Sequence, residues 1–249
     1  MTMALSTTRP QAAGVTAMRA GQPVAQAEFW RDAAALAARL PAQDYAVNLC
    51  TDRYRFMTGL TAALQRRQIS LMPSANVPAA LAALAEDYPD LYALTDGSYP
   101  SPNCSTLPCM AYPGDLEGDV PQRSPFALPG SQTAVILFTS GSTGRPKPVV
   151  KTWSTLQYSA QSAGARLGIG SLRGATIIGT VPHHHSYGLE SVILLGLLHG
   201  ITIDAGWPLY PADIRAALAQ APRPRILVTT PVHLRALLAE PDGMPQAAT

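Results

Sequence analysis

The chain has 249 residues, of which 47% are apolar, and its 18 basic and 16 acidic side chains leave a formal net charge of +2. This size and apolar content can build one large domain or two smaller ones around a substantial core. A net charge this small gives no concentrated basic surface of the kind that nucleic-acid binding needs. The most apolar stretch, residues 191–198, is too short to cross a bilayer. We therefore expect no nucleic-acid partner and no integral membrane segment.

Strand and helix patterns alternate along the first half of the chain. Residues 1–25 are rich in Ala, Thr and Gln and are expected to be a disordered N-terminal segment. Apolar residues at helical spacing and short β-rich runs then predict helices at 28–40, 54–67 and 77–86 and strands at 47–49, 69–72 and 91–94. The alternation predicts a first α/β subdomain over residues 26–130 with a mainly parallel sheet. Its last part, residues 99–129, is a proline-rich connection with room for short antiparallel strands.

The same alternation resumes with an apolar strand expected at 134–138. Further helices are expected at 151–166, 188–199, 211–220 and 231–240, and further strands at 175–181, 201–204 and 225–228. These elements predict a second α/β subdomain over residues 131–249. The predicted fold class is therefore α/β, with two successive, largely parallel α/β layers.

A loop of hydroxyl and glycine residues follows the expected strand at 134–138. It consists of Thr139, Ser140, Gly141, Ser142, Thr143, Gly144, Arg145, Pro146 and Lys147. Glycines let the backbone approach a ligand closely, hydroxyl and N–H groups donate to phosphate oxygens, and a lysine offsets phosphate charge. Most such loops are linkers that bind nothing, but Pro146 and Pro148 stiffen this one. Composition alone leaves phosphate binding and a plain loop as even alternatives.

A Walker A loop, G-x-x-x-x-G-K-[ST], is a second interpretation of these residues. Gly141 and Lys147 have the required separation. Pro146 stands where the second glycine should be, and Pro148 stands where the Ser or Thr that holds magnesium should be. A P-loop phosphotransferase is therefore disfavoured, although it stays open as an alternative function.

Residues 139–147 resemble the phosphate-binding signature of the adenylate-forming superfamily, which includes acyl- and aryl-CoA synthetases, luciferases and nonribosomal peptide adenylation domains. A second signature of that superfamily, Pro-x-x-His-x-x-Gly after a buried strand, is matched by Pro182, His185 and Gly188. The resemblance implies the N-terminal part of the adenylate-forming fold. It also implies that a carboxylic acid, aryl or fatty, attacks ATP to give an acyl- or aryl-adenylate. A thiol of CoA or of acyl carrier protein phosphopantetheine then takes the acyl group.

The resemblance further implies roles for single residues. The nucleotide-binding candidates, which would clasp the β- and γ-phosphates of ATP, are Thr139, Ser140, Gly141, Ser142, Thr143, Gly144 and Lys147. Mg²⁺ would bridge the phosphates, with the Thr143 hydroxyl among its ligands. His185 is the catalytic candidate, and it lines the acid pocket together with Ser186, Tyr187 and Gly188.

Three consecutive histidines, His183 to His185, also suggest a metal site. Adjacent residues of an extended segment point to opposite sides, and no cysteine or carboxylate lies near them at ligand spacing. The pattern favours His183 and His184 as partly buried histidines with local hydrogen bonds. For His185 the resemblance implies a place near the reacting carboxylate.

The resemblance covers nearly the whole chain but only about the first half of a typical superfamily member. The later adenine- and ribose-binding signatures are not found after Gly188, and we expect the small C-terminal lid domain to be absent. We therefore expect a fragment that binds part of the nucleotide without completing turnover. A non-catalytic nucleotide- or acid-binding module, or a truncated gene product, is the alternative.

Two further features bear on substrate and compartment. Residues 48–56 look like the ligases of aryl-polyene pigment pathways, which load an aromatic acid on an acyl carrier protein. The three cysteines, Cys50, Cys104 and Cys109, are odd in number and lack zinc-ligand spacing, which indicates reduced thiols. No apolar signal-peptide core is present at the N-terminus, and the expected location is the cytoplasm.

Overall fold

The computed structural model describes residues 2–4, 14–97, 107–116, 127–139 and 146–240. Its contacts divide the chain into two compact units, which are described separately. Within the described residues, unit 1 contains 2–4, Ala27–Tyr158 and His184–Ser186. Unit 2 contains 14–26, Ser159–His183 and 187–240.

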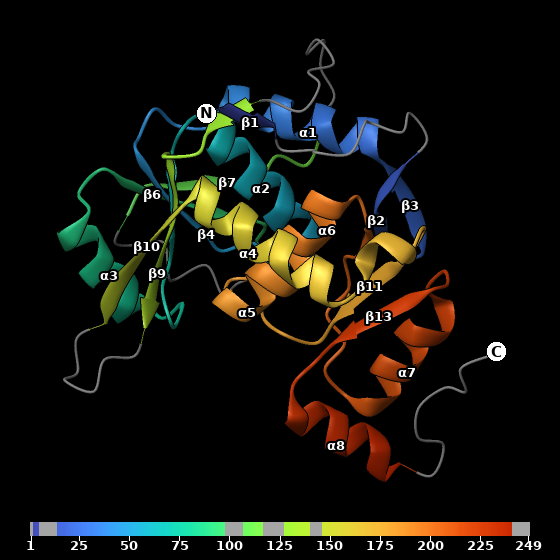
Figure 1. Cartoon of the computed structure of the whole chain (residues 1–249). Coiled ribbons are helices and arrows are strands. Elements are labelled where there is room, and N and C mark those ends of the chain that lie inside the picture. Colours follow the sequence, from blue (N-terminus) through green and yellow to red (C-terminus); the bar gives the residue numbers. More distant parts are fainter. Residues whose placement is uncertain (1, 5–13, 98–106, 117–126, 140–145, 241–249) are drawn as a thin grey trace. The chain divides into compact units, whose positions relative to one another are not determined.

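Unit 1 is built on a six-stranded sheet in the order β10-β9-β5-β4-β6-β7 (Figure 1). The strands are β4 (Tyr45–Asn48), β5 (Ile69–Met72), β6 (Leu91–Thr95), β7 (Cys109–Ala111), β9 (Thr133–Thr139) and β10 (Lys147–Thr152). All neighbours are parallel except β9 and β10, which form an antiparallel pair. A small antiparallel pair, β1 (Thr2–Ala4) with β8 (Ala127–Pro129), belongs to the same unit.

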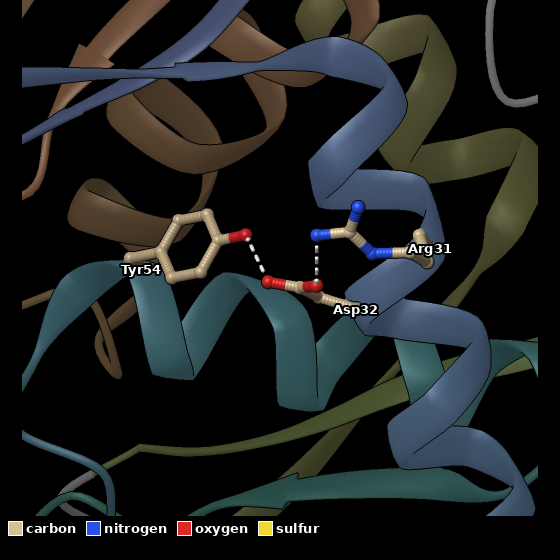
Figure 2. Close-up of polar contacts among 3 residues, drawn as sticks. All are labelled: Arg31, Asp32 and Tyr54. Atoms are coloured by element: carbon tan, nitrogen blue, oxygen red, sulfur yellow. Dashed lines mark hydrogen bonds and ion pairs between the residues drawn. The ribbon is translucent and has the colours of Figure 1, made fainter. Parts of the chain in front are cut away.

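The helices of unit 1 are α1 (Gln26–Arg39), α2 (Arg53–Gln65) and α3 (Pro78–Asp87). Helix α2 begins where Asp52, its N-cap, accepts a hydrogen bond from the Arg55 N–H at 2.9 Å, which satisfies one of the free donors of the first turn. Figure 2 shows the contact between α1 and α2, in which the buried Tyr54 hydroxyl donates to Asp32 Oδ2 at 2.7 Å. The other oxygen of Asp32 faces Arg31 at 3.4 Å. Burial and the Asp32 carboxylate raise the pKa of Tyr54, so this hydroxyl keeps its proton.

Unit 2 is built on a five-stranded sheet in the order β13-β11-β12-β2-β3 (Figure 1). The strands are β2 (Val15–Arg19), β3 (Gln22–Ala25), β11 (Thr176–Gly179), β12 (Thr202–Asp204) and β13 (Arg225–Val228). Only β2 and β3 are antiparallel to each other. The helices are a π-helical segment (Leu189–Leu194), α6 (Leu195–His199), α7 (Pro211–Gln220) and α8 (Pro231–Ala239), and the short α5 (Ser186–Gly188) begins in unit 1 and ends in unit 2. Helix α4 (Trp153–Arg166) begins in unit 1 and ends in unit 2.

The helices and strands expected from the sequence are confirmed between residues 28 and 240, with shifted ends at most of them. Two features differ. The expected helix at 188–199 is interrupted by its π-helical segment, and β7 pairs with β6 in parallel rather than antiparallel fashion. Within the described residues of 99–129, the part that forms an antiparallel strand is β8.

The N-terminal segment and the unit boundary also differ from expectation. Residues 15–25 form the β2–β3 hairpin instead of a disordered segment, and residues 1 and 5–13 lie outside the described residues. The hairpin turns at Ala20 and Gly21, with φ of 47° and 78°, and β2 pairs with β12 far along the chain. The boundary lies at residue 158 rather than 130, because β9 and β10 hydrogen-bond into the first sheet.

Candidate functional site

The glycine- and hydroxyl-rich loop leaves the first sheet at the end of β9 and returns at the start of β10. Strand β9 is buried at Ala134 and Val135 and runs parallel to β5, so the loop starts at the carboxyl edge of the parallel strands, where α/β sheets bind ligands. Thr139 and Lys147 are paired in the antiparallel register, and the Thr139 hydroxyl donates to the Lys147 carbonyl at 3.5 Å. Both residues are exposed. The two ends of the loop are thus fixed side by side.

The interior of this loop lies outside the described residues. The candidates concerned are Ser140, Gly141, Ser142, Thr143 and Gly144. Their roles, including the magnesium role of Thr143, therefore stay predictions. Thr139 and Lys147 are the nucleotide-binding candidates that the structure does describe, and it places both in unit 1.

The Walker A interpretation is wrong. A Walker loop connects a strand to a helix, and its lysine lies at the start of that helix. Here Lys147 is the first residue of strand β10, and Pro148 is paired with Phe138 across the hairpin. Strand β10 is the last strand of its sheet, which is where proline is tolerated because one side of an edge strand needs no donor.

The three histidines differ in their surroundings. His183 is 1% exposed, and its ring contacts Trp207 edge to face with centroids 5.9 Å apart. His184 and His185 are part-buried neighbours with ring centroids 4.5 Å apart. Burial, aided by His185, lowers the pKa of His184 from 6.5 to about 4, and burial also lowers the pKa of His185. Both imidazoles are therefore mainly neutral at pH 7.

Gly188 packs closely against the backbone of Pro182, so the two ends of the histidine segment, residues 182–188, lie side by side. A Cβ at this position would overlap the carbonyl oxygen of Pro182 and would crowd His183 Cα at 3.0 Å. Only glycine fits without a backbone shift, which gives a physical reason for the spacing between Pro182 and Gly188. Ser186 and Tyr187 are both exposed, and the Tyr187 hydroxyl donates to the Thr229 carbonyl at 3.3 Å.

The acid-pocket candidates do not all belong to one unit. His185 and Ser186 belong to unit 1, together with Thr139 and Lys147. Tyr187 and Gly188 belong to unit 2. Among the described residues, no group of three or more histidine, cysteine or acidic side chains could hold a metal ion.

A polar cluster that the sequence analysis did not single out lies in unit 2. Thr180 follows β11, Thr229 follows β13, and His233 is in the first turn of α8; their side chains meet by hydrogen bonds. Because β11 and β13 are parallel neighbours, the residues that follow them meet at the same edge of the sheet. The sequence carries a weak signal for this cluster, since a threonine follows each apolar strand.

Residues 48–56, which suggested a pigment-type ligase, have structural contacts in unit 1. Asn48 bridges two backbone groups, because its Oδ1 accepts from Cys50 N at 3.1 Å and its Nδ2 donates to Phe56 O at 3.0 Å. Asp96 accepts from the N–H groups of Thr51 and Asp52 at 2.9 and 2.8 Å. Burial raises the pKa of the Cys50 thiol, so this cysteine is not a nucleophile at neutral pH.

No helix in the described part of the chain is both long and apolar enough to span a membrane. The sequence matches a family model described as AMP-binding enzyme over residues 47–249. It is 36% identical to a 4-coumarate–CoA ligase of Rhodobacter capsulatus over 118 residues, which is 46% of this chain and 30% of that protein. It is 32% identical to the nonribosomal peptide synthetase ivoA of Emericella nidulans over 147 residues, which is 55% of this chain and 8% of that protein.

Solved structures share the fold at lower identity. The o-succinylbenzoate coenzyme A synthetase of Bacillus subtilis in complex with ATP and magnesium ion has a TM-score of 0.79 at 21% identity, over 95% of this chain and 50% of that chain. Apo MatB of Rhodopseudomonas palustris has a TM-score of 0.77 at 16% identity, over 95% and 50%. At these identities the likeness shows the fold alone, and it confirms the expected α/β class. The chain spans half or less of the length of these four proteins.

Proposed function

Because the chain belongs to the family of AMP-binding enzymes, we propose that the protein activates a carboxylic acid with ATP and passes it to a thiol. A carboxylate oxygen forms a bond to the α-phosphorus as the bond to pyrophosphate breaks, which leaves an acyl-adenylate. A thiolate then attacks the acyl carbon, and AMP leaves. The family match over residues 47–249, which contains both signatures, carries this proposal.

The β9–β10 loop is the proposed site of the β- and γ-phosphates. Support comes from its ends, since Thr139 and Lys147 are held in register at the carboxyl edge of a parallel sheet. Catalysis of phosphoryl and adenylyl transfer depends mainly on such positioning and on charge stabilisation.

Magnesium is proposed to bind with the nucleotide. Mg²⁺ prefers oxygen ligands and is commonly held by substrate phosphates with only one or two protein groups. The exposed Thr139 hydroxyl at the end of β9 is an oxygen donor of the right kind, and Thr143 is the ligand that we propose from the sequence. The bound ion would offset negative charge on the phosphate oxygens.

His185 is proposed to contact the reacting carboxylate, with Ser186, Tyr187 and Gly188 as its neighbours in the acid pocket. Burial lowers the pKa of His185 and keeps its imidazole neutral at pH 7. A neutral imidazole can hydrogen-bond to a carboxylate without forming an ion pair. The carboxylate thereby keeps more of the nucleophilic character that attack on phosphorus requires.

The acid is proposed to be aromatic and the acceptor to be CoA. A 4-coumarate–CoA ligase, whose name gives an aromatic acid and CoA, is among the similar proteins. An acyl carrier protein, as in pigment pathways, is the alternative acceptor of the acyl group. We also propose a cytoplasmic location, because the three cysteines are odd in number and lack zinc-ligand spacing, a pattern typical of reduced thiols.

The nucleotide part is tested by calorimetric titration of the 249-residue chain with MgATP and with AMP. Lys147→Ala should weaken MgATP binding by about tenfold, because a charge-assisted phosphate contact is lost. Lys151→Ala is the matched control, since it removes the same charge from the same strand, and it should change the affinity by less than about twofold. Equal losses in the two variants would mean that positive charge acts only as a general field.

Pyrophosphate exchange separates a catalyst from a non-catalytic module that binds nucleotide and acid. Exchange that requires 4-coumarate or another aromatic acid would support the ligase. Tight MgATP and acid binding without exchange in the whole protein would support the module. His185→Ala should then change the dependence on acid and leave MgATP affinity near that of the unchanged protein.

A further inference from the structure

Thr180 lies at the centre of a part-buried hydrogen-bond chain in unit 2. Its side chain is 0% exposed, and its hydroxyl lies 2.8 Å from Thr229 Oγ1 and 2.9 Å from His233 Nδ1. A threonine hydroxyl has one proton and two lone pairs, so it can donate to one neighbour and accept from the other. Both contacts are short enough for good hydrogen bonds. Thr180 therefore joins the end of β11 to the start of α8.

The direction of this chain depends on the tautomer of His233. If Nδ1 is unprotonated, Thr180 donates to it and Thr229 donates to Thr180. If Nδ1 carries the proton, both bonds reverse. Thr230 Oγ1 also lies 3.3 Å from His233 Nδ1, so loss of the Thr180 hydroxyl removes the bridge between Thr229 and His233 and leaves Nδ1 with this longer contact.

The same neighbourhood holds both ends of the histidine segment, residues 182–188. At its start, the Thr180 carbonyl accepts from Trp207 Nε1 at 3.1 Å, and the Trp207 ring packs against His183. At its end, the Tyr187 hydroxyl donates to the Thr229 carbonyl at 3.3 Å. Thr229 thus contacts Thr180 through its hydroxyl and Tyr187 through its carbonyl. The junction of β13 and α8 therefore contacts the end of the segment directly, at Tyr187, and its start indirectly, through Thr180 and Trp207.

We propose that Thr180 and His233 are positioning residues for the histidine segment, and through it for acid binding; this second part rests on the proposed function. Neither residue needs to touch the acid. Their hydrogen bond fixes Thr180, the residue after β11, and the backbone enters the segment two residues later at Pro182. A displacement of about 1 Å at a reacting group can cost about a hundredfold in rate, so the fixing of this loop bears directly on activity.

The first test needs no ligand and measures amide hydrogen exchange of a peptide covering residues 182–188. Thr180→Val and His233→Ala should each speed exchange of this peptide by about tenfold, because the segment opens more easily. His233→Asn should restore slower exchange, since the asparagine amide can place a polar atom near the position of Nδ1. Unchanged exchange in Thr180→Val and His233→Ala would overturn the proposal.

Thr202→Val is the matched control. Thr202 lies in β12 of the same sheet, and its hydroxyl donates to the Val15 carbonyl at 2.9 Å. This variant also loses one part-buried threonine hydrogen bond, but at the opposite, amino end of the sheet. Exchange of residues 182–188 should stay near that of the unchanged protein. An equal increase in Thr202→Val would show general destabilisation and would overturn the positioning role.

A second test uses 4-coumarate as the probe acid and MgATP as the probe nucleotide, both by calorimetry. Thr180→Val should weaken 4-coumarate binding by about fivefold to tenfold, the worth of one hydrogen bond, and leave MgATP binding within about twofold. Equal weakening of both ligands would contradict a role at the acid site. If the unchanged protein binds neither ligand, the proposed function fails, whereas the exchange experiment still decides whether the two residues position the segment.

Discussion

His184 lies part-buried beside His185, and burial holds the pKa of its imidazole near 4 in the folded protein. In the unfolded chain the ring returns to its ordinary pKa of 6.5. The folded-state pKa is the lower of the two, so unfolding takes up a proton wherever the pH lies between them. The stability linked to His184 is therefore present above pH 6.5 and is lost progressively as the pH falls towards 4.

The size of this loss follows from the two pKa values. Each pH unit between them is worth about 1.4 kcal/mol. At pH 7 the ring is mostly neutral in both states, and at pH 5 it is protonated only in the unfolded chain. Lowering the pH from 7 to 5 should therefore reduce the free energy of unfolding by about 2 kcal/mol through His184 alone. His185, whose pKa is also lowered by burial, adds a loss of the same sign.

Urea unfolding curves at pH 7 and pH 5, recorded for the unchanged protein and for His184→Gln, measure the contribution of His184 to the pH dependence of the free energy of unfolding. Glutamine is polar but does not titrate, so the fall in unfolding free energy between the two pH values should be smaller in the variant by about 2 kcal/mol. The carboxylates and His185 contribute to both proteins and cancel in the comparison. If the two proteins lose the same free energy between pH 7 and pH 5, His184 is not held in its neutral form.

Two substitutions test packing in the two units, each by the urea midpoint. Gly188→Ala should destabilise unit 2 by about 1–3 kcal/mol because the new Cβ meets the backbone at Pro182, whereas Gly170→Ala, which has open space, should cost little. Equal midpoints for the two alanine variants would contradict the close approach at Gly188. Tyr54→Phe should cost about 1–2 kcal/mol because it removes the hydrogen bond to Asp32, and a midpoint equal to that of the unchanged protein would contradict that contact.

Local patterns were sufficient for much of the fold. The run at residues 69–72 is the strand β5 with the same ends, and the helix at 211–220 is α7 with the same ends. Proline marks one end of each segment, since Pro73 follows β5 and Pro211 begins α7. The strand before the hydroxyl-rich loop was equally clear, because a short apolar run next to glycines leaves few alternatives.

Features set by distant partners were not visible in the sequence. The β2–β3 hairpin turns at Ala20, a residue that rarely adopts positive φ, and β2 is held by β12 far along the chain. The unit boundary depends on β9 pairing with β5, which local composition does not encode. The Thr180–His233 contact joins residues 53 positions apart, and no local spacing rule connects them.

The candidate site was predicted in part. The sequence located the loop whose ends, Thr139 and Lys147, pair across a hairpin, but the strand after Lys147 was needed to reject the Walker geometry, and phosphate binding stays a prediction. The histidine segment was located from its spacing, and the reason for that spacing, the contact of Gly188 with Pro182, came only from the structure.

The central claim is that the β9–β10 loop holds the phosphates of ATP, and amide chemical shifts of the isotopically labelled 249-residue chain test it most directly. Titration with MgATP should move the amide signals of residues 140–147 other than Pro146, which has no N–H, and AMP, which lacks the β- and γ-phosphates, should leave most of them in place. Movement of other signals by MgATP, with those of 140–147 unchanged, would contradict the account.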